Sequence, residues 1–491
     1  MRSVPAPNVP SSGKPGRDVL NTAPLGTPSH LSTPGTVLAS PRGVSTMEEA
    51  RDWLQARGIE DVECVTPDLA GVPRGKMMPT RKFLDASTLA LPSSIFMQTV
   101  SGEYPEDSET FEYPASDGDL KLVPDLATLS VTPWESDPTA QVICDMRTHG
   151  GEAVPYTPRQ VLRRIVDLYA TEGMMPVVAP EVEFYLVKTN PDPDFPLEPP
   201  IGRSGRTIAG NNSYSIAGVN EFDELIDDIY HFCEAQGLEI ETLIHEEGVS
   251  QLEINLNHGH PLALADQVFL FKRTIREAAL KHDMYATFMA KPIQGQPGSA
   301  MHIHHSVVDG EGRNVFSNEG GEASDTFRHF VGGLQRHLPN ALPMLAPYVN
   351  SYRRLAPHTT APVNTSWGPD NRTTGLRVPR SEPAARRIEN RIPSSDTNPY
   401  LAIAASLACG FLGIRDKVEP NEPTTASANL GSVDLPRTLL DAVVALEADA
   451  ALVEMLGSDF VFTYGAVKRT EFETFMEVIS PWEREFLLLN V

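Results

Sequence analysis

Two short segments carry acidic or histidine side chains at a spacing of two residues. They are Glu181-Val182-Glu183 and His302-Ile303-His304, and each lies in a run of residues that favours a β-strand. Residues two apart on a strand project from the same face, so each pair would present its side chains together. Metal binding is one use of such pairs. For either pair alone, a solvated strand face is the commoner outcome, so the spacing leaves both interpretations open.

A third segment holds acids on both sides of a predicted turn. Between His245 and Glu253, the residues Gly248 and Ser250 separate Glu246 from Glu253, which could converge from the two arms of a hairpin. Several converging carboxylates need a cation, and a carboxylate-rich set with one imidazole suits Mg²⁺ or Mn²⁺ better than zinc or copper. Because Mg²⁺ is commonly held by a few carboxylates and substrate phosphates, this segment indicates a site that handles ATP.

An arginine series without any lysine lies further along the chain. Its members are Arg353, Arg354, Arg372, Arg377, Arg386, Arg387 and Arg391. A merely charged surface usually mixes lysine with arginine, whereas the planar guanidinium suits bidentate recognition of carboxylate and phosphate. Ligand recognition and solvated arginine faces remain equally open from this pattern.

The elements that must position these residues fall into three regions. Residues 1–45 are rich in Pro, Ser, Thr and Gly and predict a disordered tail, although Met47 could also be the true start of translation. Thr46 and Glu49 have capping-box spacing and predict the first helix. Short apolar runs in 46–150 predict a small sheet domain. In 151–491, predicted helices at 159–173, 222–237, 266–282 and 325–337 alternate with strands at 177–187, 252–256, 286–289 and 301–307, which predicts a larger α+β domain.

Composition excludes several classes of protein. The 491 residues include 65 acidic and 40 basic side chains, a net charge of −25 that argues against nucleic-acid binding. The four scattered cysteines predict reduced thiols in a cytoplasmic protein rather than a disulfide framework or zinc site. The most apolar stretch, 400–414, is too short to span a membrane and predicts a buried core helix. No secretory signal is evident, so export is not expected.

Taken together, an ordered series of motifs resembles the glutamine synthetase superfamily from about residue 60 onward. The motifs are Asp68-Leu69-Ala70-Gly71 with Gly75-Lys76, Val123-Pro124-Asp125, Ala286-Thr287-Phe288-Met289-Ala290-Lys291-Pro292, Gly298-Ser299-Ala300-Met301-His302-Ile303-His304, Asn350-Ser351-Tyr352-Arg353-Arg354-Leu355, Asn371-Arg372, Arg386-Arg387-Ile388-Glu389 and Asn398-Pro399-Tyr400. Each is short, and their order along the chain makes the resemblance specific.

This resemblance implies a β-grasp N-terminal domain, a large catalytic domain, and a ring-shaped oligomer, commonly a dodecamer, with active sites between subunits. It implies two metal ions, one held by Glu183, Glu246 and Glu253 and the other by Glu181, His302 and Glu389. It places His304, Arg372, Arg377 and Arg387 at the ATP phosphates and Ser306 and Tyr214 near the nucleoside. It assigns glutamate to Arg354, Arg391 and the backbone of Gly298.

The implied reaction explains why such a site needs cations more than a nucleophile. A carboxylate is a poor electrophile, so the γ-phosphoryl group of ATP is first transferred to the glutamate side chain. Phosphoryl transfer is catalysed chiefly by positioning and by electrostatic stabilisation, which metals and arginines supply. An amine then attacks the acyl phosphate after losing a proton.

Departures from the motifs favour an amine larger than ammonia. Ammonia-using relatives carry a glutamate in the loop where Thr360 stands, and an aspartate where an approximate alignment places Gln98. With Arg372 and His304, these two positions form the predicted catalytic set. The segment Pro297-Gly298-Ser299-Ala300 and the residue Ala384 also depart from the common pattern.

The resemblance is closest to γ-glutamylpolyamine synthetases, which are similar to glutamate-putrescine ligase. This chain shares with them the motif Ser366-Trp367-Gly368. The predicted activity joins the γ-carboxylate of glutamate to a polyamine or a small monoamine. An ammonia-using glutamine synthetase and a non-catalytic structural relative are the alternatives, but all six proposed metal ligands are present. The sequence leaves the amine open. Glu103 and Asp107 could receive a distal ammonium group, and His358 could serve as the base, although an exposed acidic loop is the simpler explanation of the two acids.

Overall fold

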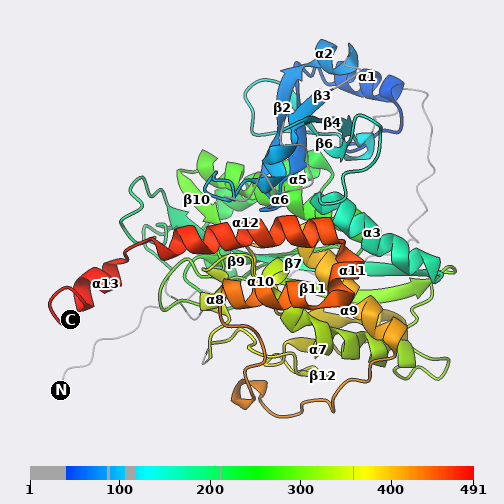
Figure 1. The fold of residues 1–491 in the computed structure, drawn as a ribbon. Coiled ribbons are helices and arrows are strands. Elements are labelled where there is room, and N and C mark those ends of the chain that lie inside the picture. Colours follow the sequence, from blue (N-terminus) through cyan, green and yellow to red (C-terminus); the bar gives the residue numbers. More distant parts are fainter. Residues whose placement is uncertain (1–39, 86–88, 106–116, 209, 211, 358) are drawn as a thin grey trace, which may run out of the picture. The chain divides into compact units, whose positions relative to one another are not determined.

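The computed structural model describes residues 40–491 apart from 86–88, 106–116, 209, 211 and 358 (Figure 1). The compact unit begins at Ser40, ahead of the predicted start of folded structure. Gly43 N and Val44 N donate hydrogen bonds to Leu129 O and Leu126 O at 2.8 and 3.0 Å, so the last residues of the predicted tail belong to this unit. Residues 1–39 of that tail lie outside the described residues. Helix α1 (Met47–Ala56) begins with the predicted capping box of Thr46 and Glu49.

The first sheet occupies the region where a small sheet domain was predicted. It has six strands in the order β2-β1-β6-β4-β3, with β5 paired to β6. β1 runs parallel to β6 and antiparallel to β2. Its elements are β1 (Asp61–Pro67), β2 (Pro73–Pro79), α2 (Thr80–Asp85), β3 (Leu89–Pro92), η1 (Ser93–Met97), β4 (Asp119–Pro124), η3 (Leu126–Thr128), β5 (Ser130–Val131) and β6 (Thr139–Arg147).

The second sheet carries the acidic and histidine segments. Its eight strands run in the order β12-β13-β14-β11-β7-β9-β8, with β10 also paired to β7. The strands are β7 (Met174–Lys188), β8 (Ile240–His245), β9 (Gln251–Leu256), β10 (Met284–Thr287), β11 (Met301–Asp309), β12 (Trp367–Pro369), β13 (Leu376–Val378) and β14 (Ile388–Asn390). Three neighbouring strands, β11, β7 and β9, therefore bring together segments that are far apart in the sequence (Figure 1).

Helices follow and separate these strands. They are α3 (Pro158–Thr171), α4 (Ile216–Asn220), α5 (Asp223–Gln236), α6 (Pro261–Lys281), α7 (Asp325–Leu345), α8 (Ser351–Arg354), η4 (Pro383–Ala385), α9 (Pro399–Asp416), η5 (Ala428–Leu430), α10 (Leu439–Ala448), α11 (Ala450–Leu456), α12 (Ser458–Met476) and α13 (Pro481–Phe486). The predicted core helix is confirmed as α9, where Pro399–Gly413 are all buried. Helix α7 extends beyond its predicted end at 337, through Pro339 and Pro343. Within the described ranges, no single helix suits a membrane span, although the bent pair Ala450–Leu456 and Ser458–Phe486 passes by length and composition.

A buried ionic network joins the two sheets' regions through α3 and α6. Arg159 Nη2 lies 2.8 Å from Asp266 Oδ2 and also 2.8 Å from Asp125 Oδ2, and its Nη1 lies 2.6 Å from Asp145 Oδ1. The hydroxyl of Tyr400 on α9 donates to Asp266 Oδ1 at 2.6 Å. Because these charges are paired and hydrogen-bonded, their burial is compatible with a stable core.

Candidate active site and metal centre

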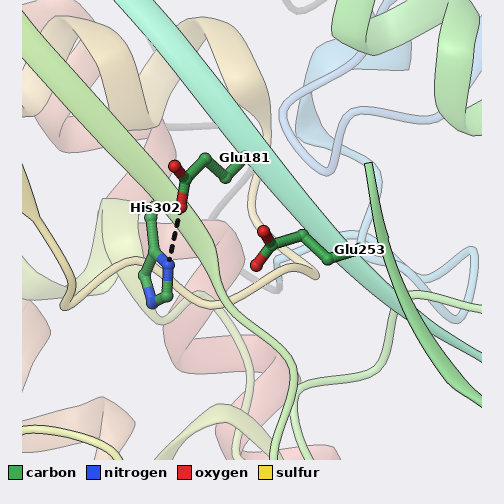
Figure 2. Close-up of side chains that lie close together, drawn as sticks. All are labelled: Glu181, Glu253 and His302. Carbon is green, nitrogen blue, oxygen red and sulfur yellow. Dashed lines mark hydrogen bonds and ion pairs between the residues drawn. The ribbon is translucent and has the colours of Figure 1, made fainter. Parts of the chain in front are cut away.

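Strand register places the predicted acids and histidines on one face of the second sheet. Glu181 on β7 stands opposite His302 on β11 and opposite Asn255 on β9. Two residues along β7, Glu183 stands opposite Glu253. Figure 2 shows the side chains of Glu181, Glu253 and His302 pointing toward one another from these three strands. The predicted strand placement of both two-residue motifs is therefore confirmed, and their side chains converge.

Two compact groups of possible ligand atoms result, and they share Glu181. His302 Nδ1 lies 3.3 Å from Glu181 Oε2, and His304 Nε2 lies 2.9 Å from Glu181 Oε1. His302 Nδ1 is also 3.8 Å from Glu389 Oε1. Within each group the ligand atoms lie within 4.8 Å of one another, and the groups are Glu181, Glu253 and His302, and Glu181, His304 and Glu389.

The grouping differs from the one that the resemblance implied. His304, predicted at the ATP phosphates, belongs to a possible ligand group, whereas Glu183 and Glu246 lie outside both groups among the described residues. Glu183 Oε2 instead accepts hydrogen bonds from Ala300 N at 2.8 Å and from Gln251 Nε2 at 3.1 Å. Those donors orient the carboxylate, and its other oxygen remains available for a cation.

The protonation behaviour of the acids indicates a shortage of positive charge on the β9 side. Burial, followed by repulsion from Glu183 and Glu181, raises the pKa of Glu253 to about 10. Burial, followed by repulsion from Glu246, raises the pKa of Glu183 to about 8. Buried like charges are unfavourable without a cation, so this carboxylate-rich set with its imidazoles fits a hard divalent metal ion.

The β14 side of the site is supplied with cations by the chain itself. Burial opposes ionisation of Glu389, but Arg391 is the largest opposing influence, and the pKa of that carboxyl lies below its usual value. Arg377 Nη1 lies 2.7 Å from Glu389 Oε2, and Arg391 pairs with Glu389 Oε1. Burial, reinforced by Arg391, lowers the pKa of His302 to about 4, so its imidazole is neutral and can act as a metal ligand.

A cavity of about 390 Å³, called here the acidic cavity, gathers most of the predicted site. Its lining includes the predicted residues Glu181, Glu183, Tyr214, Glu246, Glu253, Gly298, His302, Arg354, Thr360, Arg372, Arg377 and Arg391. A second cavity of about 430 Å³, called here the histidine cavity, is lined by Glu181, His304, Ser306 and Arg387 among others. Glu181 and Asn255 line both cavities, so the two lie side by side.

The arginine series divides between the site and other surfaces. Arg354 is 3% exposed, and its two terminal nitrogens donate to Ile392 O and Arg391 O at 2.8 and 2.9 Å. Arg387 Nε donates to His304 Nδ1 at 3.3 Å. In contrast, Arg386 donates to Ser317 and Gly321, and Arg353 lies over the ring of Phe475, so neither contributes to the two cavities.

Glycine is required at position 298 by close packing. A Cβ atom there would lie 2.6 Å from Ala290 O and 2.6 Å from Arg354 Cγ. The backbone of Gly298 consequently forms part of the cavity wall directly beside Arg354. This contact is consistent with a wall shaped by backbone rather than by a side chain.

Three predicted residues are not grouped within this chain as the resemblance implied. Gln98 donates to Gly102 O at 3.2 Å and lines neither the acidic nor the histidine cavity. Tyr214 lines the acidic cavity and Ser306 the histidine cavity, so the structure does not bring together the two residues predicted near the nucleoside. Asp107 and His358 lie outside the described residues.

Three polar residues of the acidic cavity were not singled out from the sequence. Gln251 and Asn255 precede and follow Glu253 by two residues on β9, so the strand period that identified Glu181 and Glu183 could have found them. Asn255 Oδ1 is buried and has no hydrogen-bond partner among the described residues. Glu247 also lines the cavity. In the sequence it stands next to Glu246 in the same acidic segment, and the spacing did not distinguish the two acids.

Known proteins match this chain over most of its length. Residues 155–487 match the family model for the glutamine synthetase catalytic domain. The chain is 32% identical over 448 residues to glutamate--isopropylamine ligase of Pseudomonas sp, covering 89% of this chain and 96% of the relative. It is 33% identical to gamma-glutamylputrescine synthetase of Escherichia coli (strain K12), covering 91% and 96% of the two chains.

Relatives named glutamine synthetase also match the chain. A glutamine synthetase of Halobacterium salinarum is 32% identical, covering 88% of this chain and 94% of the relative. Among solved structures, a complex of GmaS with ADP has a TM-score of 0.76 and 28% identity, covering 89% of this chain and 98% of GmaS. The long matched region, the two cavities and the converging strands lead to one conclusion: the chain belongs to the glutamine synthetase family.

Proposed function

We propose that this protein is an ATP-dependent ligase that joins the γ-carboxylate of glutamate to the amino group of a polyamine or small monoamine. The observation that carries the choice of acceptor is Thr360. It is exposed and lines the acidic cavity at the loop position where ammonia-using members are expected to carry a glutamate. An acceptor larger than ammonia is further supported by relatives named glutamate--isopropylamine ligase, gamma-glutamylputrescine synthetase and gamma-glutamylethanolamide synthetase.

Members of this family use ATP and divalent metal ions, and we propose Mg²⁺ or Mn²⁺ as two ions in this site. Glu181, Glu253, His302, His304 and Glu389 would supply the closest ligands, with Glu183 and Glu246 completing the set. Oxygen-rich ligand sets favour these hard ions over softer metals. When bound, the ions would neutralise phosphate charge and orient the transferred phosphoryl group.

The remaining side chains suit binding and charge stabilisation. Arg387 and Ser306 in the histidine cavity would contact the nucleotide, and Arg372 and Arg377 would face the phosphates from the acidic cavity. Arg354 and Arg391 would hold glutamate beside Gly298. Fixed guanidinium groups stabilise developing negative charge without reorganisation during the reaction.

The chemical steps balance as two successive transfers. A γ-carboxylate oxygen of glutamate attacks the γ-phosphorus of ATP, the bond to the bridging oxygen breaks, and ADP leaves. The nitrogen lone pair of the deprotonated amine then attacks the γ-carbonyl carbon of the acyl phosphate, inorganic phosphate leaves with the bonding pair, and the nitrogen releases one proton to give the neutral amide. Positioning of the amine by side chains of the acidic cavity would favour its attack over hydrolysis.

Three broader features belong to the same proposal. The first sheet is proposed to form a β-grasp domain over residues 46–150, and residues 151–491 the catalytic domain. Gln98, which lines neither cavity of its own chain, is compatible with an oligomeric ring, commonly a dodecamer, in which it serves a neighbouring subunit. Four free cysteines, all buried, support a cytoplasmic location.

The proposal is tested by measuring phosphate release with ATP, glutamate and Mg²⁺ in the presence of separate amines. Putrescine, spermidine, ethanolamine, isopropylamine and ammonium are compared, and mass spectrometry identifies the amide. Turnover with an organic amine well above that with ammonium is expected. Ammonium as the best acceptor would instead make the protein a glutamine synthetase with a rebuilt ammonium site.

A further inference from the structure

We infer that Glu247 binds the acceptor, a protonated primary alkylamine, at the mouth of the acidic cavity. This inference rests on the proposed function, because it assigns a residue to the acceptor of that reaction. The carboxylate of Glu247 would attract the alkylammonium ion in place of the loop acid that Thr360 replaces.

Glu247 is a glutamate of the acidic cavity that is not assigned to a metal ion. Among the described residues, the glutamates that line it are Glu181, Glu183, Glu246, Glu247 and Glu253. All except Glu247 belong to the proposed metal ligands. The recorded hydrogen bond of Glu247 runs from its backbone N–H to Glu246 Oε2 at 3.2 Å, and its carboxylate has no ion pair or hydrogen bond with any residue in the described part of the chain. Its charge is therefore free to bind a cation that enters from solvent.

The loop that carries Glu247 is held firmly against the cavity wall. A Cβ atom on the neighbouring Gly248 would lie 1.9 Å from the hydroxyl oxygen of Tyr185, so only glycine allows this close packing. The Tyr185 hydroxyl in turn donates to Pro297 O at 2.8 Å, and Pro297 lines the acidic cavity. The carboxylate of Glu247 is thus presented from a fixed backbone, which is what a specific contact requires.

Exposure separates a floor of the cavity from its mouth. Glu183, Glu253 and Arg354 are 7%, 6% and 3% exposed and form the floor, where glutamate is proposed to bind. Tyr214 is 63% exposed, Thr360 is also exposed, and Glu247 is half-buried. The backbone N–H of Tyr214 donates to His245 O at 2.7 Å, which keeps Tyr214 beside the loop of Glu247. An acceptor that enters last would meet Glu247 before it reaches the floor.

The lining of the acidic cavity favours an amine with a carbon substituent. Ile244, Ala361 and Pro362 line the same cavity and offer apolar surface, and the ring of Tyr214 adds an aromatic face. Alkyl carbons of the amine would bury this apolar surface, whereas ammonium would leave it exposed to water. A carboxylate beside apolar surface therefore fits a primary alkylammonium ion better than ammonium.

The test compares Glu247→Gln, which removes the charge, with Glu247→Asp, which retains it. Glu224→Gln is the matched control, because Glu224 is an exposed acid on α5 outside both cavities. KM is measured for the best amine of the wild-type enzyme, for glutamate and for ATP. The formation of acyl phosphate without amine is followed by positional isotope exchange in labelled ATP. Glu247→Gln is expected to raise the KM for the amine about 10- to 100-fold, the range for losing a hydrogen bond to a charged group.

The KM of Glu247→Asp for the amine is expected to lie between those of the wild-type enzyme and Glu247→Gln. In both variants, the KM for glutamate and the rate of isotope exchange are expected to remain at wild-type values. An unchanged amine KM in Glu247→Gln would overturn the inference. A selective rise in the glutamate KM would also overturn it, by assigning Glu247 to the α-ammonium group of glutamate. Loss of isotope exchange would overturn it in favour of a role at the metal ions. A wild-type enzyme that uses no amine would instead refute the proposed function before any variant is compared.

Discussion

Binding of a divalent ion should release protons from Glu183 and Glu253, and the number should depend on pH. Their pKa values are raised to about 8 and about 10 by burial and by neighbouring glutamates. Both carboxyls hold most of their protons at pH 7, and a metal ligand must be deprotonated. When two metal ions bind to one site, we expect about two protons to be released at pH 7 and about one at pH 9. For each proton released, the metal affinity should rise roughly tenfold per pH unit.

The sign of the accompanying stability change follows from the same raised values. A carboxyl with a higher pKa in the folded state binds its proton more tightly there than when unfolded. The free energy of unfolding of the metal-free protein should therefore fall as pH rises from the unfolded value of 4.5 toward about 8 for Glu183 and about 10 for Glu253. The increase in melting temperature caused by Mg²⁺ should grow over the same interval.

Isothermal titration with Mg²⁺ in buffers of different ionisation enthalpy counts the released protons directly. Glu253→Gln removes a ligand and its proton together, so weaker binding and about one proton fewer per site are expected. Glu172→Gln, an exposed acid at the end of α3, serves as the control for a change in net charge. Pronounced Mg²⁺ binding at pH 7 without proton release would refute this account of the acids, as would unaltered binding by Glu253→Gln.

Three further substitutions test other parts of the structure. Thr360→Glu should raise kcat/KM for ammonium relative to alkylamines about tenfold, whereas Thr360→Gln, of the same size but neutral, should not; equal ratios in the two variants would remove the role assigned to this loop. Gly298→Ala, whose Cβ would lie 2.6 Å from Ala290 O, should lower kcat/KM for glutamate about 100-fold, with Gly310→Ala as a control in open space. Asp266→Ala should destabilise the fold by about 3–5 kcal/mol because it leaves Arg159 short of a buried partner, and a melting temperature like that of exposed Asp167→Ala would contradict this.

Local sequence patterns were sufficient to predict β7, β9 and β11, but not β13 and β14, which carry Arg377 and Glu389. The two-residue spacing of Glu181 with Glu183, and of His302 with His304, reflects a strand period that any buried sheet face must obey. The capping box at Thr46 and the apolar run of α9 likewise depend on neighbouring residues alone. Such features require no knowledge of which strands pair.

Contacts set by strand register and by tertiary packing could not be read in the same way. His304 approaches Glu181 because β11 lies directly beside β7, and no local pattern reports that neighbour relation. Helix α7 continues through Pro339 and Pro343 because its buried face continues to Leu345, which outweighs the missing backbone donors. The role proposed for Glu247 could not be predicted, because the amino-acid sequence does not reveal whether Glu246 or Glu247 faces the proposed metal ions.

The central claim is that glutamate is activated by ATP and then captured by an organic amine. The most direct measurement is amide formation by the wild-type protein with glutamate, ATP and Mg²⁺, with ammonium and alkylamines offered in competition and the products weighed by mass spectrometry. The wild-type protein is expected to form a γ-glutamyl alkylamide in preference to glutamine. Glutamine as the main product would contradict the assigned acceptor, and the absence of any amide or phosphate release would favour a non-catalytic member of the family.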